Sequence, residues 1–111
     1  MEFGLKNKTA LVTGGSHGIG LAIALVLAQE GCKVGICGRT PSHIMEADTQ
    51  LRSFSDEILS ITCDVMAPGT IPKLIDKVKD TFGTVHILVN NVGGMGRSGS
   101  LNMEQTEDIV W

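Results

Sequence analysis

The chain has 111 residues, of which 42% are hydrophobic and 19% are charged, and its formal net charge is −3 at pH 7. This length allows one domain at most, and the hydrophobic fraction is sufficient for a packed core. The negative net charge and the absence of any lysine or arginine run argue against a nucleic-acid partner.

No stretch of the sequence predicts a membrane span. The longest apolar stretch, residues 19–28, is about half of the ~20 residues that a span requires. Residues 1–4 lack the basic and apolar regions of a secretory signal peptide. We therefore expect a cytoplasmic protein with no membrane partner.

The cysteines, Cys32, Cys37 and Cys63, are odd in number and show no C-x-x-C spacing. None of the histidines provides the short paired spacing that a zinc site requires. Because the cysteines fall at the edges of predicted strands, we interpret them as reduced, buried structural residues and expect no metal site.

The first elements are a strand, a glycine turn and a helix. Residues 10–12 are a short apolar run that predicts a buried strand, and an uninterrupted helical stretch covers residues 21–30. This order presents a helix N-terminus to an anion such as phosphate. Gly14 allows a tight turn, Gly18 leaves space for a pyrophosphate, and Gly20 allows the helix to pack closely on the sheet.

A second strand and helix follow. Gly31 is placed to end the first helix, and residues 33–37 predict a strand. Thr40 and Pro41 are suited to be the N-cap and the first residue of a helix. Apolar residues then recur at helical spacing, which predicts a second helix over residues 41–54.

The last elements complete a four-stranded pattern. Residues 58–63 predict a third strand, residues 71–82 a third helix, and residues 85–89 a fourth strand. Residues 93–100 are rich in glycine, and Thr106 with the two acidic residues after it indicates the start of a fourth helix.

Apolar strands that alternate with helices predict an α/β fold with a parallel sheet buried on both faces. Right-handed crossovers give the strand order 3-2-1-4. We therefore predict one domain over residues 1–111, a Rossmann-type doubly wound sheet truncated after the fourth strand and the start of the fourth helix.

The end of the second strand carries information on the cofactor. Dinucleotide sites usually have an acidic residue there, which binds the adenosine ribose 2′-hydroxyl. This chain has Gly38 and Arg39 instead, without a carboxylate. A guanidinium at this place can bind a 2′-phosphate through charge-assisted hydrogen bonds, and we favour this interpretation over a solvated loop arginine.

The segment from Thr13 to Gly20 reads T-G-x-x-x-G-I-G. It resembles the cofactor-binding loop of the short-chain dehydrogenase/reductase family. His17 lies where members that prefer NADP often carry a basic residue, and a neutral loop histidine is an equally weighted alternative.

Two later segments also resemble the family. Asp64 and Val65 match its D-V pair, in which the aspartate accepts a hydrogen bond from the adenine amino group; the alternative is a turn aspartate. The segment from Asn90 to Gly93 matches its N-N-A-G motif, in which asparagines fix the loop around the cofactor ribose. The alternative for this segment is a turn that ends the strand. Val92 replaces the usual alanine, and His86 stands where relatives often have aspartate.

The resemblance covers residues 9–93 and implies binding of NADP(H). The implied cofactor-binding residues are Gly14, Ser16, His17, Gly18, Ile19, Gly20, Arg39, Asp64, Val65, Asn91, Val92 and Gly93.

The family's catalytic residues are missing from this sequence. In the family, a tyrosine four residues before a lysine transfers the substrate proton, and this chain has no tyrosine. We therefore assign no catalytic residue and expect the chain alone to reduce no carbonyl.

Two interpretations of the chain remain. It is the cofactor-binding half of an NADP(H)-dependent oxidoreductase that acts on a carbonyl/alcohol pair, with 3-oxoacyl thioesters as one candidate substrate class. Alternatively, it is a catalytically silent nucleotide-binding module or subunit. A full-length form is expected to act on a small-molecule substrate and to form a homo-oligomer.

Overall fold

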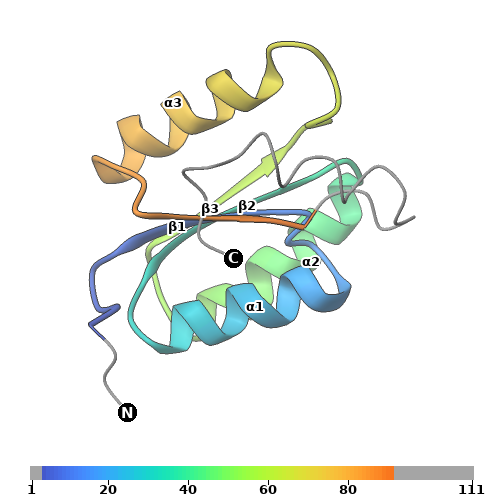
Figure 1. Ribbon diagram of the computed structural model, residues 1–111. Helices are drawn as coiled ribbons and strands as arrows, with labels where there is room; N and C mark the ends of the chain where they lie inside the picture. The colour runs from blue at the N-terminus through green and yellow to red at the C-terminus, as the bar shows by residue number, and fades with distance from the viewer. Residues whose placement is uncertain (1–3, 92–111) are drawn as a thin grey trace.

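The computed structural model describes residues 4–91, in which the apolar runs form one parallel sheet. The strands are β1 (Thr9–Thr13), β2 (Lys33–Gly38), β3 (Ile58–Thr62) and β4 (Ile87–Asn90). They pair in the order β3-β2-β1-β4, with every neighbouring pair parallel (Figure 1). The α/β Rossmann-type prediction and the strand order 3-2-1-4 are confirmed.

Helices cover both faces of the sheet. The helices are α1 (Gly18–Gln29), α2 (Pro41–Arg52) and α3 (Thr70–Phe82). Helices α1 and α2 lie on one face, and α3 lies on the other (Figure 1). Every residue of β1 is buried, as expected for a central strand covered on both faces.

The sheet separates two apolar clusters. The cluster under α1 and α2 includes Val12, Ile36 and Leu51, and the cluster under α3 includes Leu11 and Val78. Each of these side chains has 0% exposure, so each contributes about 1.5–3 kcal/mol through burial. The two clusters fix the strand ends, and the loops after those ends form the candidate site.

Several predicted boundaries differ from the structure by one to three residues. Helix α1 begins at Gly18, whereas the sequence pattern predicts a start at Leu21. Glycine has a low helix propensity, so a boundary predicted from the pattern falls after Gly20. In the structure Gly20 packs against Gly14 and Asn91 within the first turn of the helix. Helix α2 ends at Arg52, two residues before the predicted end at residue 54.

The predicted end of α1 at Gly31 and the predicted start of α2 at Thr40 and Pro41 are confirmed. Gly31, Gly69 and Gly83 flank helices with positive φ angles of 90°, 78° and 96°. Thr40 is the N-cap of α2 and Pro41 begins the helix, although the Thr40 side chain makes no capping hydrogen bond. The predicted fourth helix and the glycine-rich stretch lie outside the described residues.

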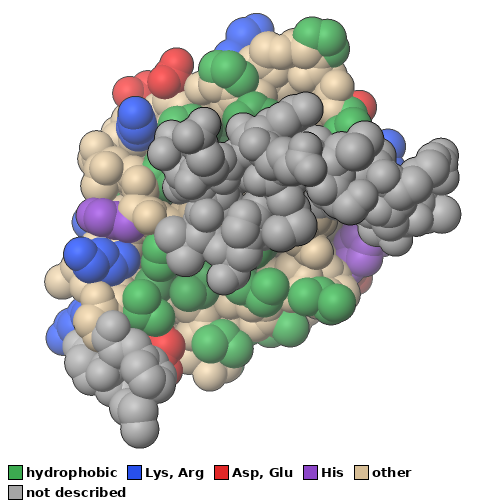
Figure 2. Space-filling model, viewed as in Figure 1, with side chains coloured by type: hydrophobic (Ala, Val, Ile, Leu, Met, Phe, Trp, Pro, Cys, Tyr) green, Lys and Arg blue, Asp and Glu red, His purple; other side chains and the backbone are tan. Residues whose placement is uncertain are grey.

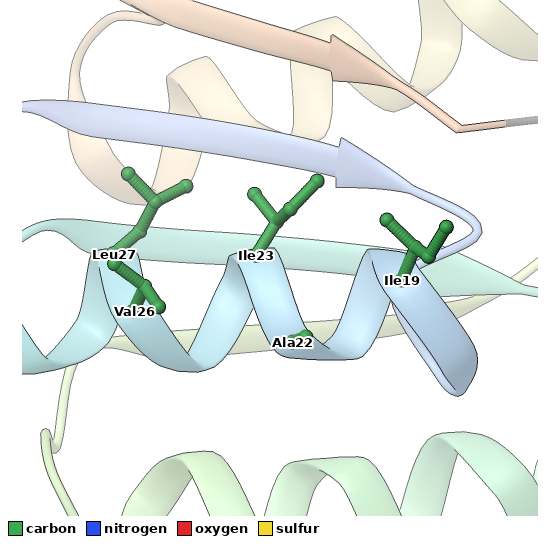
Figure 3. A pocket seen from close by; sticks show the side chains of 5 residues that line it. All are labelled: Ile19, Ala22, Ile23, Val26 and Leu27. Atoms are coloured by element: carbon green, nitrogen blue, oxygen red, sulfur yellow. The ribbon is translucent and has the colours of Figure 1, made fainter.

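The surface of α1 carries a group of apolar side chains. Ile19 is 72% exposed and Val26 is 57% exposed, and they line a shallow pocket with Ala22, Ile23 and Leu27. Hydrophobic side chains gather over α1 in the space-filling view (Figure 2). Ile19, Ile23 and Leu27 point to the same side of the helix (Figure 3). Among residues 4–91, no helix is long and apolar enough to cross a membrane.

Candidate cofactor site

The candidate site lies at the carboxyl ends of the strands. Because all strands are parallel, the loops after β1, β2, β3 and β4 leave the sheet at the same edge. The strand order reverses between β1 and β4, and ligands of doubly wound sheets bind at such a switch point. Most of the sequence-predicted residues in the described part of the chain therefore belong to one edge.

The glycine loop after β1 is held against the neighbouring strands. The backbone N–H groups of Gly14 and Gly15 donate to the carbonyl oxygen of Cys37, at 3.0 and 3.2 Å. Gly14 has a φ of 67°, in the left-handed region that favours glycine. The predicted tight turn at Gly14 is confirmed.

Gly20 allows close packing between the helix and the turn. A Cβ atom on Gly20 would collide with the carbonyl oxygen of Gly14 and would lie 2.6 Å from Nδ2 of Asn91. Backbone atoms cannot move aside as a flexible side chain can. The predicted role of Gly20 in close packing is confirmed.

The position of Gly18 fits a bound pyrophosphate. Gly18 has a φ of 61°, and no atom lies within 4 Å of the place where its Cβ would be. The residue opens α1 directly after the exposed N-cap residue His17. Open space in front of the free N–H groups of a helix is the geometry that accepts a phosphate group.

Thr13 and the two asparagines after β4 form a hydrogen-bonded group. The Thr13 hydroxyl donates to the side-chain oxygen of Asn90 at 3.0 Å and accepts the backbone N–H of Asn91 at 3.1 Å. Nδ2 of Asn91 donates to the carbonyl oxygen of Gly14 at 3.3 Å. This group connects the ends of β1 and β4. The sequence interpretation missed Thr13, because a strand-end threonine shows no partner in the sequence.

The end of β2 brings Gly38 against the glycine loop. A Cβ atom on Gly38 would lie 2.8 Å from Oγ of Ser16 and 3.3 Å from Cδ1 of Ile44. Ser16 is buried, and its Oγ lies 3.2 Å from Nδ1 of His17. The absence of a side chain at Gly38 therefore makes room for Ser16, in addition to leaving this position without a carboxylate. Arg39, the next residue, is exposed beside this contact.

A second histidine, His43, lies next to His17. The imidazole of His43, in the first turn of α2, lies with its centroid 5.2 Å from that of His17 and its plane tilted by 59°. Both side chains are exposed. The sequence interpretation did not include His43, because the contact depends on how α2 packs against the glycine loop.

Asp64 and Val65 follow β3 at the same edge. Oδ1 of Asp64 accepts the backbone N–H of Met66 at 2.9 Å, so the carboxylate also stabilises a turn. Val65 is partly buried and packs against the cluster under α3. Of the remaining predicted residues, Ile19 is exposed on α1, while Val92 and Gly93 lie outside the described residues.

The cysteines form no metal site in the part of the chain that the structure describes. Cys32 and Cys37 are buried as expected, but Cys63 is partly exposed because it lies beyond the end of β3. Burial, with a smaller contribution from neighbouring Cys63, raises the pKa of the Cys37 thiol to about 12. The buried thiol is therefore protonated at neutral pH and does not act as a nucleophile.

The His86 side chain accepts a hydrogen bond from the backbone at the start of β1. The backbone N–H of Thr9 donates to Nδ1 of His86 at 2.9 Å, and the backbone N–H of His86 donates to the carbonyl oxygen of Thr9 at 2.9 Å. The imidazole thus supplies the acceptor that an aspartate would supply at this place.

Known proteins match this sequence and this fold. The family model described as "short chain dehydrogenase" matches residues 8–110. An uncharacterized oxidoreductase of Mycobacterium tuberculosis is 38% identical over 108 residues, which cover 97% of this chain and 41% of that protein. The crystal structure of L-sorbose reductase from Gluconobacter frateurii, complexed with NADPH and L-sorbose, has a TM-score of 0.78 and 36% identity, with 84% of this chain and 36% of that one covered.

A further solved structure, NAD⁺-bound xylitol dehydrogenase, has a TM-score of 0.73 and 32% identity, with 77% of this chain and 33% of that one covered. The chain spans about two fifths of the length of the first curated relatives that it matches. The family model nevertheless covers residues 8–110, nearly the whole chain. The chain belongs to the short chain dehydrogenase family.

Proposed function

We propose that this chain binds NADP(H) as the cofactor-binding part of an oxidoreductase that acts on a carbonyl/alcohol pair. The observation that carries the proposal is the carboxylate-free end of β2, where Gly38 packs against Ser16 and Arg39 is exposed beside it. An acidic residue at this place would repel a 2′-phosphate, whereas the Arg39 guanidinium attracts one.

Each part of the cofactor has candidate partners at this edge. Gly14, Gly18 and Gly20 shape the turn that would face the pyrophosphate. Arg39 and His17 would face the 2′-phosphate. The remaining candidates at this edge are Asp64 and Val65 for the adenine, with Ser16, Ile19 and Asn91 along the rest of the cofactor. Val92 and Gly93, which lie outside the described residues, are candidates from the sequence alone.

The cofactor supplies hydride transfer when it is bound, and the residues of this chain supply binding and orientation. The sequence contains no tyrosine that could move the substrate proton. Carbonyl reduction by the whole protein therefore needs groups other than those of the cofactor site.

The solved relatives include proteins with either cofactor. L-sorbose reductase was crystallised with NADPH, and xylitol dehydrogenase was crystallised with NAD⁺. Family membership alone therefore leaves both cofactors open, and the preference for NADP(H) rests on Gly38, Arg39 and His17 of this chain.

Calorimetric titration of the purified chain with NADP⁺ and with NAD⁺ tests the proposal. Hydrogen bonds to charged groups contribute about 1.5–3 kcal/mol, so Arg39→Ala is expected to weaken NADP⁺ binding by roughly 10- to 100-fold. NAD⁺ binding is expected to change little. Lys73→Ala is the matched control, because Lys73 is an exposed cation on α3, on the other face of the sheet. An equal loss for both cofactors in Arg39→Ala would make Arg39 a structural residue.

A further inference from the structure

The imidazoles of His17 and His43 lie together next to Ser16, and Arg39 directly follows Gly38, which packs against Ser16. His17 comes from the loop after β1, Arg39 follows β2, and His43 lies in the first turn of α2. All three are exposed, and the imidazole centroids of His17 and His43 are 5.2 Å apart. The loop after β1 and the start of α2 thus bring two imidazoles together, and Arg39 is the neighbour in the chain of Gly38, which lines the same loop.

Neither imidazole has an acidic partner among residues 4–91. The ion pairs in that part of the chain join Lys33 to Glu57 and Arg52 to Asp48, and both lie elsewhere. Two adjacent imidazoles repel each other when both are charged, and a phosphate group in contact with both offsets this repulsion. The pair is therefore suited to a ligand with a dianionic group.

We propose that His43 is a third ligand of the cofactor 2′-phosphate, together with Arg39 and His17, and that it contributes to discrimination between NADP(H) and NAD(H). This inference rests on the proposed function and extends it to a residue on α2. The position of His43 carries it, because a ring in contact with His17 can reach the same phosphate group that His17 and Arg39 would face. NAD(H) lacks this phosphate, so His43 contributes little to NAD(H) binding.

A charge series at His43 tests the inference. The probes are 2′,5′-ADP and NADP⁺, which carry the 2′-phosphate, and 5′-ADP and NAD⁺, which lack it. His43→Ala is expected to weaken binding of the first two probes by about 3- to 10-fold, since an exposed charged contact is partly screened. His43→Glu is expected to weaken it by more than about 10-fold, and His43→Lys is expected to retain it within about 3-fold. Binding of 5′-ADP and NAD⁺ is expected to stay constant in all three variants.

Met45→Glu is the matched control, because Met45 is 70% exposed on the same helix and gains the same negative charge. A common loss for all four probes, or equal losses in His43→Glu and Met45→Glu, would overturn the role of His43. Binding of NADP⁺ that depends on Arg39 but not on His43 would overturn this inference alone and leave the proposed function intact. A wild-type chain without preference for 2′,5′-ADP over 5′-ADP would overturn both.

Discussion

Gly20 shows how a single residue can control the shape of the site. Its hydrogen atom faces the carbonyl oxygen of Gly14 and the amide of Asn91, where no Cβ atom fits. Gly18, two residues earlier, has open space around it and is constrained only by its φ of 61°. The two glycines therefore serve different purposes within one motif: Gly20 sets the packing of α1, and Gly18 leaves room for the ligand.

We expect Gly20→Ala to lower the free energy of unfolding more than Gly18→Ala does. The Gly20 variant forces a Cβ into backbone atoms, at a cost of about 1–3 kcal/mol or more for overpacking. The Gly18 variant adds left-handed strain of about 1–2 kcal/mol. Gly69→Ala is the control, because Gly69 has a φ of 78° and open space and lies outside the motif, at the start of α3. Urea denaturation measures all three, and a Gly20→Ala variant as stable as the wild type would contradict the close-packing account.

The sequence alone explains only one of the two roles of Gly38. It identified the missing carboxylate, but the distance between Oγ of Ser16 and the Cβ position of Gly38, 2.8 Å, requires the folded chain. A change of cofactor preference toward NAD⁺ through Gly38→Asp therefore needs a second change, Ser16→Gly, to make room. The same limitation applies to His43, whose partner His17 is remote in sequence.

At the scale of elements, hydrogen bonds of His86 stabilise the N-terminal end of β4 against β1. The imidazole accepts the backbone N–H of Thr9, and this contact joins the start of β1 to the residue before β4. The strand itself begins at Ile87, two residues after the predicted start at Val85. At this end the side-chain contact adds to the backbone hydrogen bond from the His86 N–H to the Thr9 carbonyl oxygen.

We expect His86→Ala to lower the free energy of unfolding by about 1 kcal/mol, because the Thr9 N–H loses its acceptor. His86→Asp restores an acceptor and is expected to recover most of that loss. Thr84→Ala, an exposed change in the same loop, is the control. Thermal denaturation of the four proteins makes the comparison, and equal stability of His86→Ala and the wild type would show that the bond contributes nothing.

Much of the element pattern could be predicted because hydrophobic periodicity reports burial directly. The run over residues 10–12 lies within the fully buried β1, and the apolar stripe of residues 41–54 supplies Ile44, Ala47 and Leu51 to the core. Boundaries were less accurate where tertiary contacts override local propensity, as at Gly20 in the first turn of α1. Side-chain contacts across the sheet edge, such as Thr13 with Asn90, leave no periodic signal in the sequence.

At the scale of the whole molecule, two surfaces favour self-association. Ile19 and Val26 are exposed on α1 and line its shallow apolar pocket (Figure 3). Within residues 4–91, β4 pairs with β1 and has no strand on its other side. Exposed apolar patches and open strand edges both promote contact between copies of a chain.

We expect the isolated 111-residue chain to associate with itself at rising concentration, with Val26→Lys reducing the effect. The substitution places a charge in the exposed apolar group without filling buried space. Met45→Lys is the control, because it adds the same charge to an exposed apolar position on α2. Size-exclusion chromatography with light scattering gives the mass of each protein. Monomers at every concentration, with or without Val26→Lys, would contradict this expectation.

The most direct test of the central claim maps NADP⁺ binding onto the isotope-labelled chain by two-dimensional amide spectroscopy. We predict that saturating NADP⁺ shifts the amide signals of Gly14, Gly18, Arg39 and Val65, which lie at the carboxyl edge of the sheet. We also predict that the amide signals of α3, on the opposite face, stay in place. Shifts confined to the exposed face of α1, or no shifts at saturating NADP⁺, would contradict a cofactor site at this edge.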